Sequence, residues 1–316
     1  MQVANALRRL AALVLMCAGC AGCADSHSTA QPSTALTVRP LQYRDDVVAN
    51  RLQLQVTNGL EETLRVTSIR LDWDGFESAP AERTVTLTPG RTVDLPVPIG
   101  RPACSIDGTH VADLPARDAT AVLTLDDGST RVVIVDDVDG LLTGIHHATC
   151  VEEMVALHAR VLFTDLQADA PDGHAAVVGQ LRVERGTSTG DVVVHAVAGT
   201  IPFSLAAPQA PAEGPLVVLP QGERSAATPV WFVHGRCDAH AVAETKQPFR
   251  FVATIELDDG SMHTIVVEPD ESVREMMLST VADRCRSLGL DGALDSAAGG
   301  PGEGAQVEAD DVGVGQ

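Results

Sequence analysis

The chain has 316 residues, a hydrophobic fraction of 45% and a formal net charge of −21. This length and hydrophobic content suit two folded domains and exclude a wholly disordered chain. A surface this acidic repels phosphate backbones, so we expect no nucleic-acid partner. Aromatic residues make up only 3% of the chain, which argues against a surface that binds sugars or stacks on bases.

The N-terminal residues have the pattern of a secretory leader. Arg8 and Arg9 form a positive region, residues 10–16 are a short apolar run, and small residues follow. The apolar run is too short to span a bilayer stably. We therefore expect residues 1–19 to be a signal peptide that is removed on export.

Two overlapping copies of Cys-Ala-Gly-Cys occupy residues 17–23. They resemble the bacterial lipobox, in which a cysteine that follows small residues is diacylated, although a cysteine stands where that motif usually has leucine. The resemblance implies lipidation at Cys20, which lies nearer the apolar run, with Cys23 as the alternative. Residues 20–34 are small and polar and would form a flexible tether. Ordinary cleavage and secretion is the alternative to a lipid anchor.

The four remaining cysteines indicate an internal repeat. Cys104 and Cys150 are separated by nearly the same length of chain as Cys237 and Cys285. In an exported protein these thiols meet an oxidising environment and should pair, with three connectivities open to them. Because each repeat must fold alone, the duplication favours Cys104–Cys150 and Cys237–Cys285.

The strand pattern repeats together with the cysteines. Residues 120–137 and 249–270 are apolar-alternating segments around Leu-Asp-Asp-Gly, which predicts a hairpin because Asp-Gly suits a tight turn. Residues 50–73 and 175–199 predict two further alternating strands around a Gly-containing turn. These matches occur in the same order in both halves.

The predicted fold class is therefore all-β, with two tandem antiparallel β-sandwich domains of immunoglobulin-like (Ig-like) type. Each repeat has about seven short strands separated by turn signals, as such sandwiches have. We place the first repeat at residues 35–153 and the second at 154–291. Residues 292–316 are rich in Gly, Ala and acidic residues and predict a disordered tail.

Each repeat is expected to end in a short helix that its cysteine pins to the sandwich. In the second repeat Ser272 and Glu275 form a capping-box pattern. Apolar residues follow at helical spacing, namely Val273, Met276, Met277, Val281 and Cys285. A shorter version in the first repeat consists of Leu141, Leu142, Ile145, Ala148 and Cys150.

Two motifs match a catalytic or phosphate-binding pattern, but the predicted secondary structure around them does not fit such a site. Ser188 lies in a G-x-S-x-G match, residues 186–190, but a hydrolase elbow needs a following helix and here a strand follows. Residues 299–304 are Gly-rich, with no strand or helix beside them to build a phosphate-binding loop. We interpret the first as a turn and the second as linker.

The sets of potential metal ligands are also incomplete. His234, Cys237 and His240 have plausible zinc or copper spacing, but Cys237 is required for the disulfide. His146 and His147 beside Cys150 make no better case. We therefore expect no metal ligands among these residues.

An Asp-rich segment, residues 136–140, has a superficial likeness to a calcium loop. It places Val135 and His146 where an EF-hand needs carboxylates. Asp137 or Asp139 is instead expected to cap the following helix. A looser calcium site between the domains stays open.

The tandem layout, the leader and the acidic surface resemble the uncharacterised exported lipoproteins of high-GC Gram-positive bacteria that carry tandem Ig-like domains. The resemblance implies a location on the outer face of the cytoplasmic membrane and no particular activity. We expect a non-catalytic interaction or structural module without a cofactor, whose partner is another envelope protein. An accessory domain of a cell-wall enzyme and a metal-handling lipoprotein are the alternatives.

Overall fold

The computed structural model describes residues 35–289 except 78, 113–117, 212 and 238–244. The predicted signal peptide, both lipidation candidates (Cys20 and Cys23), the tether and the acidic tail lie outside the described residues. No helix in the described part of the chain combines the length and apolar character needed to cross a bilayer.

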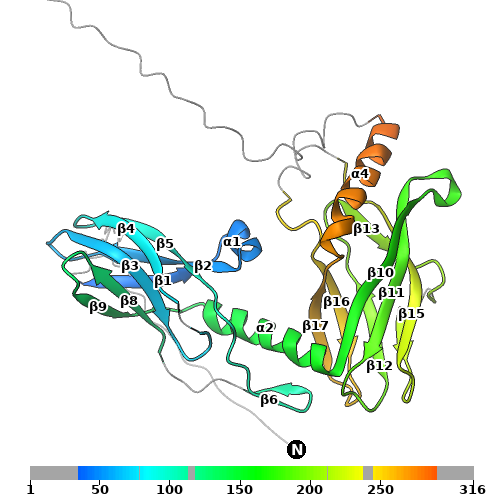
Figure 1. Ribbon diagram of the computed structural model, residues 1–316, viewed down its shortest axis with the longest axis horizontal. Helices are drawn as coiled ribbons and strands as arrows, with labels where there is room; N and C mark the ends of the chain where they lie inside the picture. Colours follow the sequence, from blue (N-terminus) through cyan, green and yellow to red (C-terminus); the bar gives the residue numbers. More distant parts are fainter. Residues whose placement is uncertain (1–34, 78, 113–117, 212, 238–244, 290–316) are drawn as a thin grey trace, which may run out of the picture. The chain divides into compact units, whose positions relative to one another are not determined.

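The two repeats follow each other along the chain (Figure 1). The first contains β1 (Leu36–Leu41), α1 (Arg44–Val48), β2 (Arg51–Asn58), β3 (Leu64–Asp72), β4 (Ala81–Leu87), β5 (Thr92–Pro98), β6 (Ile106–Asp107), β7 (His110–Val111), β8 (Thr120–Leu125), β9 (Thr130–Ile134) and α2 (Leu141–His158). The second contains β10 (Ala159–Asp169), the short 3-10 helix η1 (Pro171–Gly173), β11 (Ala176–Arg185), β12 (Val192–Val197), β13 (Phe203–Ala206), β14 (Val217–Leu219), β15 (Ser225–His234), β16 (Phe251–Glu256), β17 (Met262–Val267) and α4 (Glu271–Ser287).

Both repeats have the same sheet topology. In the first, a sheet ordered β1-β2-β5 accompanies one ordered β4-β3-β8-β9. In the second, β10-β11-β15-β13 accompanies β14-β12-β16-β17. Seven strands correspond one to one in chain order, and β13 is an addition at the edge of the second repeat. All pairings between these strands are antiparallel, which confirms the predicted all-β, Ig-like fold.

Alternation along the strands builds two separate hydrophobic cores. On β8 the side chains of Ala121, Leu123 and Leu125 are buried, and the residues between them are half-buried, because successive side chains point to opposite faces. The first core contains Trp73 and otherwise mostly aliphatic residues. The second is built around four rings that meet mostly edge to face, Phe163, Phe203, Phe232 and Phe251.

The two Asp-Gly hairpins are confirmed and have matching hydrogen bonds. Asp127 and Asp259 each accept a bond from the backbone N–H of the serine two residues later, at 2.8 Å in both turns. Gly128 and Gly260 adopt φ values of +81° and +80°, a conformation that favours glycine. These turns join β8 to β9 and β16 to β17.

The other two predicted strand pairs are strands, but they do not form hairpins. β2 pairs with β1 and β5, while β3 pairs with β4 and β8, so the turn at Gly59 carries the chain from one sheet to the other. The turn after β11 does the same. Alternation fixes which face of a strand is buried, but it does not specify the neighbouring strand.

Polar side chains, a buried Asn58 and a half-buried Arg185, hold these crossings in place. The Asn58 amide donates to the carbonyls of Glu62 and Leu87, at 2.8 Å each. At the equivalent crossing of the second repeat, the Arg185 guanidinium donates to the carbonyls of Gly190 and Pro220, at 2.6 Å each. Such bonds satisfy carbonyls that no strand partner reaches.

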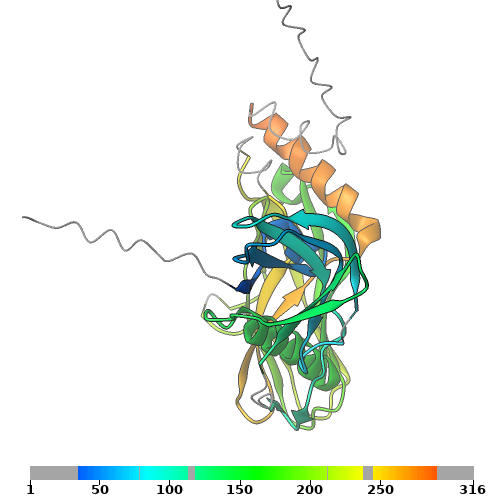
Figure 2. The same cartoon turned by 90° about the vertical axis from the view of Figure 1, so that its left-hand side faces the viewer.

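The terminal helices are present but longer than expected. α2 continues beyond Cys150 because Val151, Met154 and Val155 extend its apolar spacing into the second core. The expected boundary between residues 153 and 154 therefore falls inside this helix. α4 lies against β10, β11 and β15 and is drawn in orange in Figures 1 and 2.

The predicted helix start agrees with the structure in the first repeat and differs from it in the second. Asp137 accepts bonds from the N–H groups of Leu141 and Leu142, at 2.8 and 3.1 Å, as predicted for a residue that caps α2. The capping box at Ser272 is wrong, because α4 already begins at Glu271, with Asp270 at its N-cap. Ser272 is therefore part of the first helical turn.

Candidate functional site

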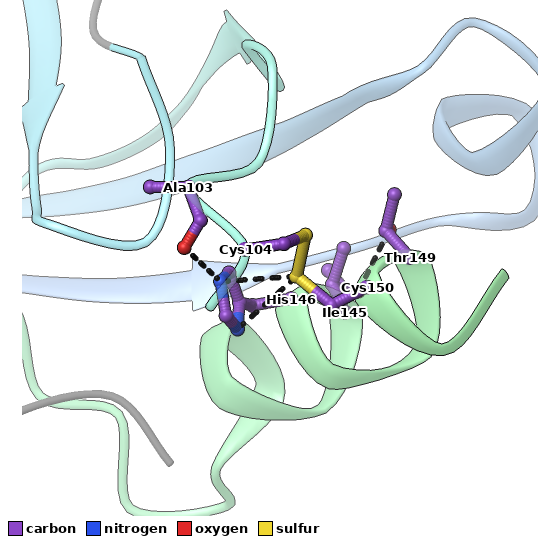
Figure 3. The surroundings of a disulfide bond; sticks show 6 residues. All are labelled: Ala103, Cys104, Ile145, His146, Thr149 and Cys150. Carbon is purple, nitrogen blue, oxygen red and sulfur yellow. Dashed lines mark hydrogen bonds between the residues drawn. A yellow bond between two sulfur atoms is a disulfide. The ribbon is translucent and has the colours of Figure 1, made fainter. Parts of the chain in front are cut away.

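The strongest candidate for a reactive group in the fold is a histidine beside the first disulfide. Cys104, in the loop after β5, is bonded to Cys150 in the middle of α2. One helical turn before Cys150, His146 points its ring at the sulfur (Figure 3). The His146 side chain is only 3% exposed, and Cys150 is completely buried.

The His146 ring has an apolar surrounding and two polar contacts. The rings of Trp73 and Phe76 meet it edge-on, at centroid distances of 5.8 and 5.7 Å. Its Nε2 atom lies 3.3 Å from the carbonyl oxygen of Ala103 and 3.3 Å from Sγ of Cys150. Because a carbonyl oxygen only accepts, we assign the hydrogen to Nε2, which places an N–H donor beside the sulfur.

The second disulfide occupies the same place in its repeat but lacks this donor. Cys237, after β15, is bonded to Cys285 in α4. Val281 stands one helical turn before Cys285, at the position that His146 has in α2, and is buried in the second core. Both sulfurs of this pair belong to buried residues, whereas Cys104 of the first pair is only half-buried. The two bonds therefore differ in polarity and in access.

Cys104, His146 and Cys150 also form the one group of potential metal ligands within the described residues, with ligand atoms inside 4.8 Å of one another. A soft metal would need the two sulfurs as thiolates. In this structure they are bonded to each other. The geometry therefore describes a disulfide with a histidine neighbour.

The remaining sequence motifs have structural roles. Ser188 is buried in the crossing between β11 and β12, where Arg185 donates to its carbonyl at 3.2 Å, so the turn interpretation of G-x-S-x-G is confirmed. Of the proposed zinc motif, Cys237 is in a disulfide and His240 lies outside the described residues. Burial, followed by the nearby Arg284, lowers the pKa of His234 below its ordinary value. The Asp137 carboxylate is committed to the start of α2.

A second feature is the exposed edge of the first sandwich, which we call the β9 edge (Thr130–Ile134). Val132 and Ile134 are 66% and 64% exposed, which is unusual for two large apolar residues on one strand. The register of β9 with β8 leaves the backbone groups of residues 130, 132 and 134 pointing away from the sheet. Within the described residues β8 is the partner of β9 over this stretch.

A surface pocket continues the β9 edge towards β1. Its apolar lining includes Leu36, Val38 and Leu60 together with Val132 and Ile134. An extended peptide that pairs with the β9 edge could place alternate side chains in this pocket.

The corresponding edge of the second repeat is partly covered, with Thr264 exposed and Val266 half-buried. Thr264 and Val266 of β17 take the positions of Val132 and Ile134, counted from the common Asp-Gly turns. α2 packs along β17, and the Glu152 carboxylate accepts a bond from the backbone N–H of Val266. Covering a strand edge with a helix is a common protection against unwanted pairing.

The fold and the two disulfides define a class, exported Ig-like sandwich proteins, because such bonds persist in oxidising compartments. No protein-family model and no curated protein matches the chain.

Solved structures with weak similarity include the chaperone–tip adhesion subunit complex CsuC–CsuE of Acinetobacter baumannii, at 7% identity and a TM-score of 0.16, covering 70% of this chain and 93% of that chain. A protein of Porphyromonas gingivalis W83 matches at 13% identity and a TM-score of 0.18, covering 75% of this chain and 97% of that chain. The exo-chitosanase CsxA of Amycolatopsis orientalis matches at 13% identity and a TM-score of 0.18, covering 74% of this chain and 26% of that chain. At such TM-scores these matches carry no functional argument.

Proposed function

We propose that the protein is a lipid-anchored module of the cell envelope that binds a partner protein through the β9 edge. In this proposal Cys20 holds the mature N-terminus at the outer face of the cytoplasmic membrane. The sandwiches then present a non-catalytic binding surface to another envelope protein.

The observation that carries the binding role is the contrast between equivalent edges. α2 packs along β17 and bonds to the backbone of Val266, whereas Val132 and Ile134 of β9 are exposed beside unpaired backbone groups. Exposed apolar edges favour aggregation, so proteins usually protect them unless they bind a partner. Adding a strand to such an edge gives affinity through backbone hydrogen bonds, and the neighbouring pocket supplies side-chain selectivity. The partner is therefore expected to present an extended segment with apolar residues at alternate positions.

The test of the binding role is site-specific photo-crosslinking in the cells that make the protein. A photoreactive amino acid at Val132 should give one discrete crosslinked product, which mass spectrometry identifies. The matched control is the same probe at Val252 on β16, another exposed valine of the equivalent sheet. Equal products from both positions, or none from Val132, would refute the β9 edge as the binding surface.

Two further variants make the crosslinking result specific. Replacing Val132 and Ile134 together by lysine should abolish the product obtained from a probe placed at Arg131. The variant must retain the wild-type thermal transition, because both replaced side chains are exposed. A crosslink that survives these replacements would contradict pairing through this edge.

The anchor is tested separately by metabolic labelling with a fatty acid. Cys20→Ser should abolish the label and release the protein from the membrane fraction, because two acyl chains supply the stable attachment. Cys23→Ser is the matched control and should keep both label and location. The reverse pattern would move the acceptor to Cys23, and an unlabelled wild-type protein would favour secretion.

A further inference from the structure

The two disulfides of the molecule have equivalent positions but very different surroundings. In the first, the half-buried residue Cys104 is joined to the fully buried residue Cys150, beside the N–H donor of His146. In the second, both cysteines are buried and the helix presents Val281 instead. Thiol–disulfide exchange depends on access to the attacked sulfur and on how well the leaving sulfur bears negative charge. The first bond meets both conditions.

We propose that Cys104–Cys150 is a thiol-exchange site, in which a small thiol attacks Cys104 and Cys150 leaves as a thiolate held by His146. The substrate class is a low-molecular-weight thiol that reaches the exposed side of the loop after β5. This activity is independent of the proposed binding role of the β9 edge.

The step balances without any other reagent. The incoming thiolate forms a new sulfur–sulfur bond with Sγ of Cys104. The bond between Cys104 and Cys150 breaks, and its electron pair stays on Sγ of Cys150. The incoming thiol is oxidised to the mixed disulfide, and Cys150 is reduced. A second molecule of the thiol would release the mixed disulfide as a small disulfide and leave both cysteines as thiols.

The direction of attack follows from the burial of the two sulfurs. Cys150 lies in the middle of α2 and is 0% exposed, so a thiol in solution meets Cys104 first. Burial alone opposes a thiolate at Cys150, because a charge is costly in an apolar surrounding. His146 offsets that cost, since its Nε2–H lies 3.3 Å from Sγ of Cys150. The ring carries this donor whether it is neutral or protonated.

The surroundings of the ring keep the donor in position. The Ala103 carbonyl, 3.3 Å from Nε2, selects the form of the ring that has its hydrogen on this atom. Trp73 and Phe76 pack against the ring edge-on. Because Nε2 lies 3.3 Å from both acceptors, its hydrogen bond can shift from the carbonyl to the thiolate, the stronger acceptor, while the ring stays in place.

The test is timed partial reduction of the full-length protein with limiting 2-mercaptoethanol. The reaction is stopped by acid and alkylation, and the peptides are identified by mass spectrometry. Cys104–Cys150 should open at least about tenfold faster than Cys237–Cys285, since a hydrogen bond to a charged group is worth that much. The first product should carry mercaptoethanol on Cys104 and the alkyl group on Cys150. Equal opening rates, or the reverse placement of the two groups, would overturn the proposal.

Variants at position 146 separate the effect of the hydrogen-bond donor on the opening rate from the effect of solvent access to Cys104. His146→Val copies the second repeat and should slow the opening of Cys104–Cys150 by about tenfold, which is the loss of one charged hydrogen bond. His146→Gln keeps an N–H donor and should recover part of that rate. The matched control Val281→Ala should not slow the opening of Cys237–Cys285. An unchanged rate in folded His146→Val, or a slower second pair in Val281→Ala, would refute the role of His146.

Folding of the variants is checked independently of their reactivity. Near-ultraviolet circular dichroism reports the packing of Trp73, which contacts His146 directly. If His146→Val loses this signal, the comparison is made with His146→Gln against the wild type alone. A His146→Gln protein that opens its first disulfide at the rate of the second would then contradict the proposal.

Discussion

The two repeats show how one topology can carry two different chemical environments. Seven strands, one Asp-Gly hairpin turn and a disulfide to a terminal helix recur in both. The first core places Trp73, Phe76 and His146 around its disulfide, whereas the second has Val281 in the place of His146. The shared parts maintain the sandwich, and the parts that differ are the ones that can be assigned a function.

The largest expected effect is the loss of either disulfide. Replacing Cys104 and Cys150 together by alanine, or Cys237 and Cys285 together, should each lower the free energy of unfolding by about 4 kcal/mol. The two losses should be similar because the closed loops are similar, with sequence separations of 46 and 48. Urea denaturation of the wild-type protein and of each double variant measures them. A loss below about 1 kcal/mol in either repeat would contradict the equivalence of the two bonds.

Truncation of the two cores should produce effects that are equal to or smaller than the loss of a disulfide and that differ between the cores. Phe232→Ala removes a ring that contacts Phe163, Phe203 and Phe251, and should cost about 4 kcal/mol. Leu54→Ala in the first core should cost about 3 kcal/mol, because it leaves a smaller cavity. Calorimetry measures both variants. A larger loss for Leu54→Ala would reverse the ranking of the two cores.

The next largest effect on stability is expected at a buried carboxylate in the first repeat. Asp46 accepts hydrogen bonds from Arg51, Gln53 and the backbone of Tyr43, at 2.6, 2.8 and 3.1 Å. Burial alone would raise the pKa of Asp46, but these hydrogen bonds outweigh it and lower the pKa below its ordinary value. Asp46→Ala should therefore destabilise the protein by about 3 kcal/mol at pH 7, since it leaves buried partners unpaired.

The pH dependence of the Asp46 contribution has a definite sign. The pKa of Asp46 is lower in the folded protein than in the unfolded chain, where it is about 4. The stabilisation is therefore complete at pH values above the unfolded pKa, and it disappears as the pH falls through the folded pKa. Chemical denaturation at a series of pH values should show wild type and Asp46→Ala converging in acid. A difference that stays constant down to pH 2 would contradict this assignment.

The smallest stability effect is expected at Asp258, which is exposed in the second repeat. Its carboxylate accepts bonds from the backbone of Thr189 and Gly190, at 3.1 and 3.2 Å, and the Thr189 bond is the main cause of its lowered pKa. Solvent screens these contacts, so Asp258→Asn should cost less than about 1 kcal/mol at pH 7. Thermal melts of this variant and of Asp46→Ala, recorded side by side, check the ranking. An equal or larger loss at Asp258 would contradict the role given to burial.

The sequence predicts the local features of the fold well. Asp-Gly in an alternating segment identifies the β8–β9 and β16–β17 hairpins because the turn chemistry is contained in adjacent residues. The strands within residues 50–73 are predicted too, but their separation into two sheets depends on contacts such as that between Asn58 and Leu87. The start of α4 is misplaced at Ser272 because Asp270, the N-cap residue, has Val273 three residues later and so shows no capping-box pattern.

The candidate site is only partly contained in the sequence. His146 and Cys150 are four residues apart, and that spacing on a helix predicts a contact between them. His146 is nevertheless dismissed at the level of sequence, where it is considered only as a metal ligand. Trp73, Phe76 and Ala103, which orient its ring, come from distant parts of the chain. The exposure of Val132 likewise depends on which strand edges are covered.

The most direct test that each repeat is closed by its own disulfide is a peptide map of the protein recovered from its native compartment and digested without reduction. Crosslinked peptides should join Cys104 to Cys150 and Cys237 to Cys285, each within its own repeat. Peptides that join one repeat to the other, or four alkylated free thiols, would contradict the description of two internally closed sandwiches.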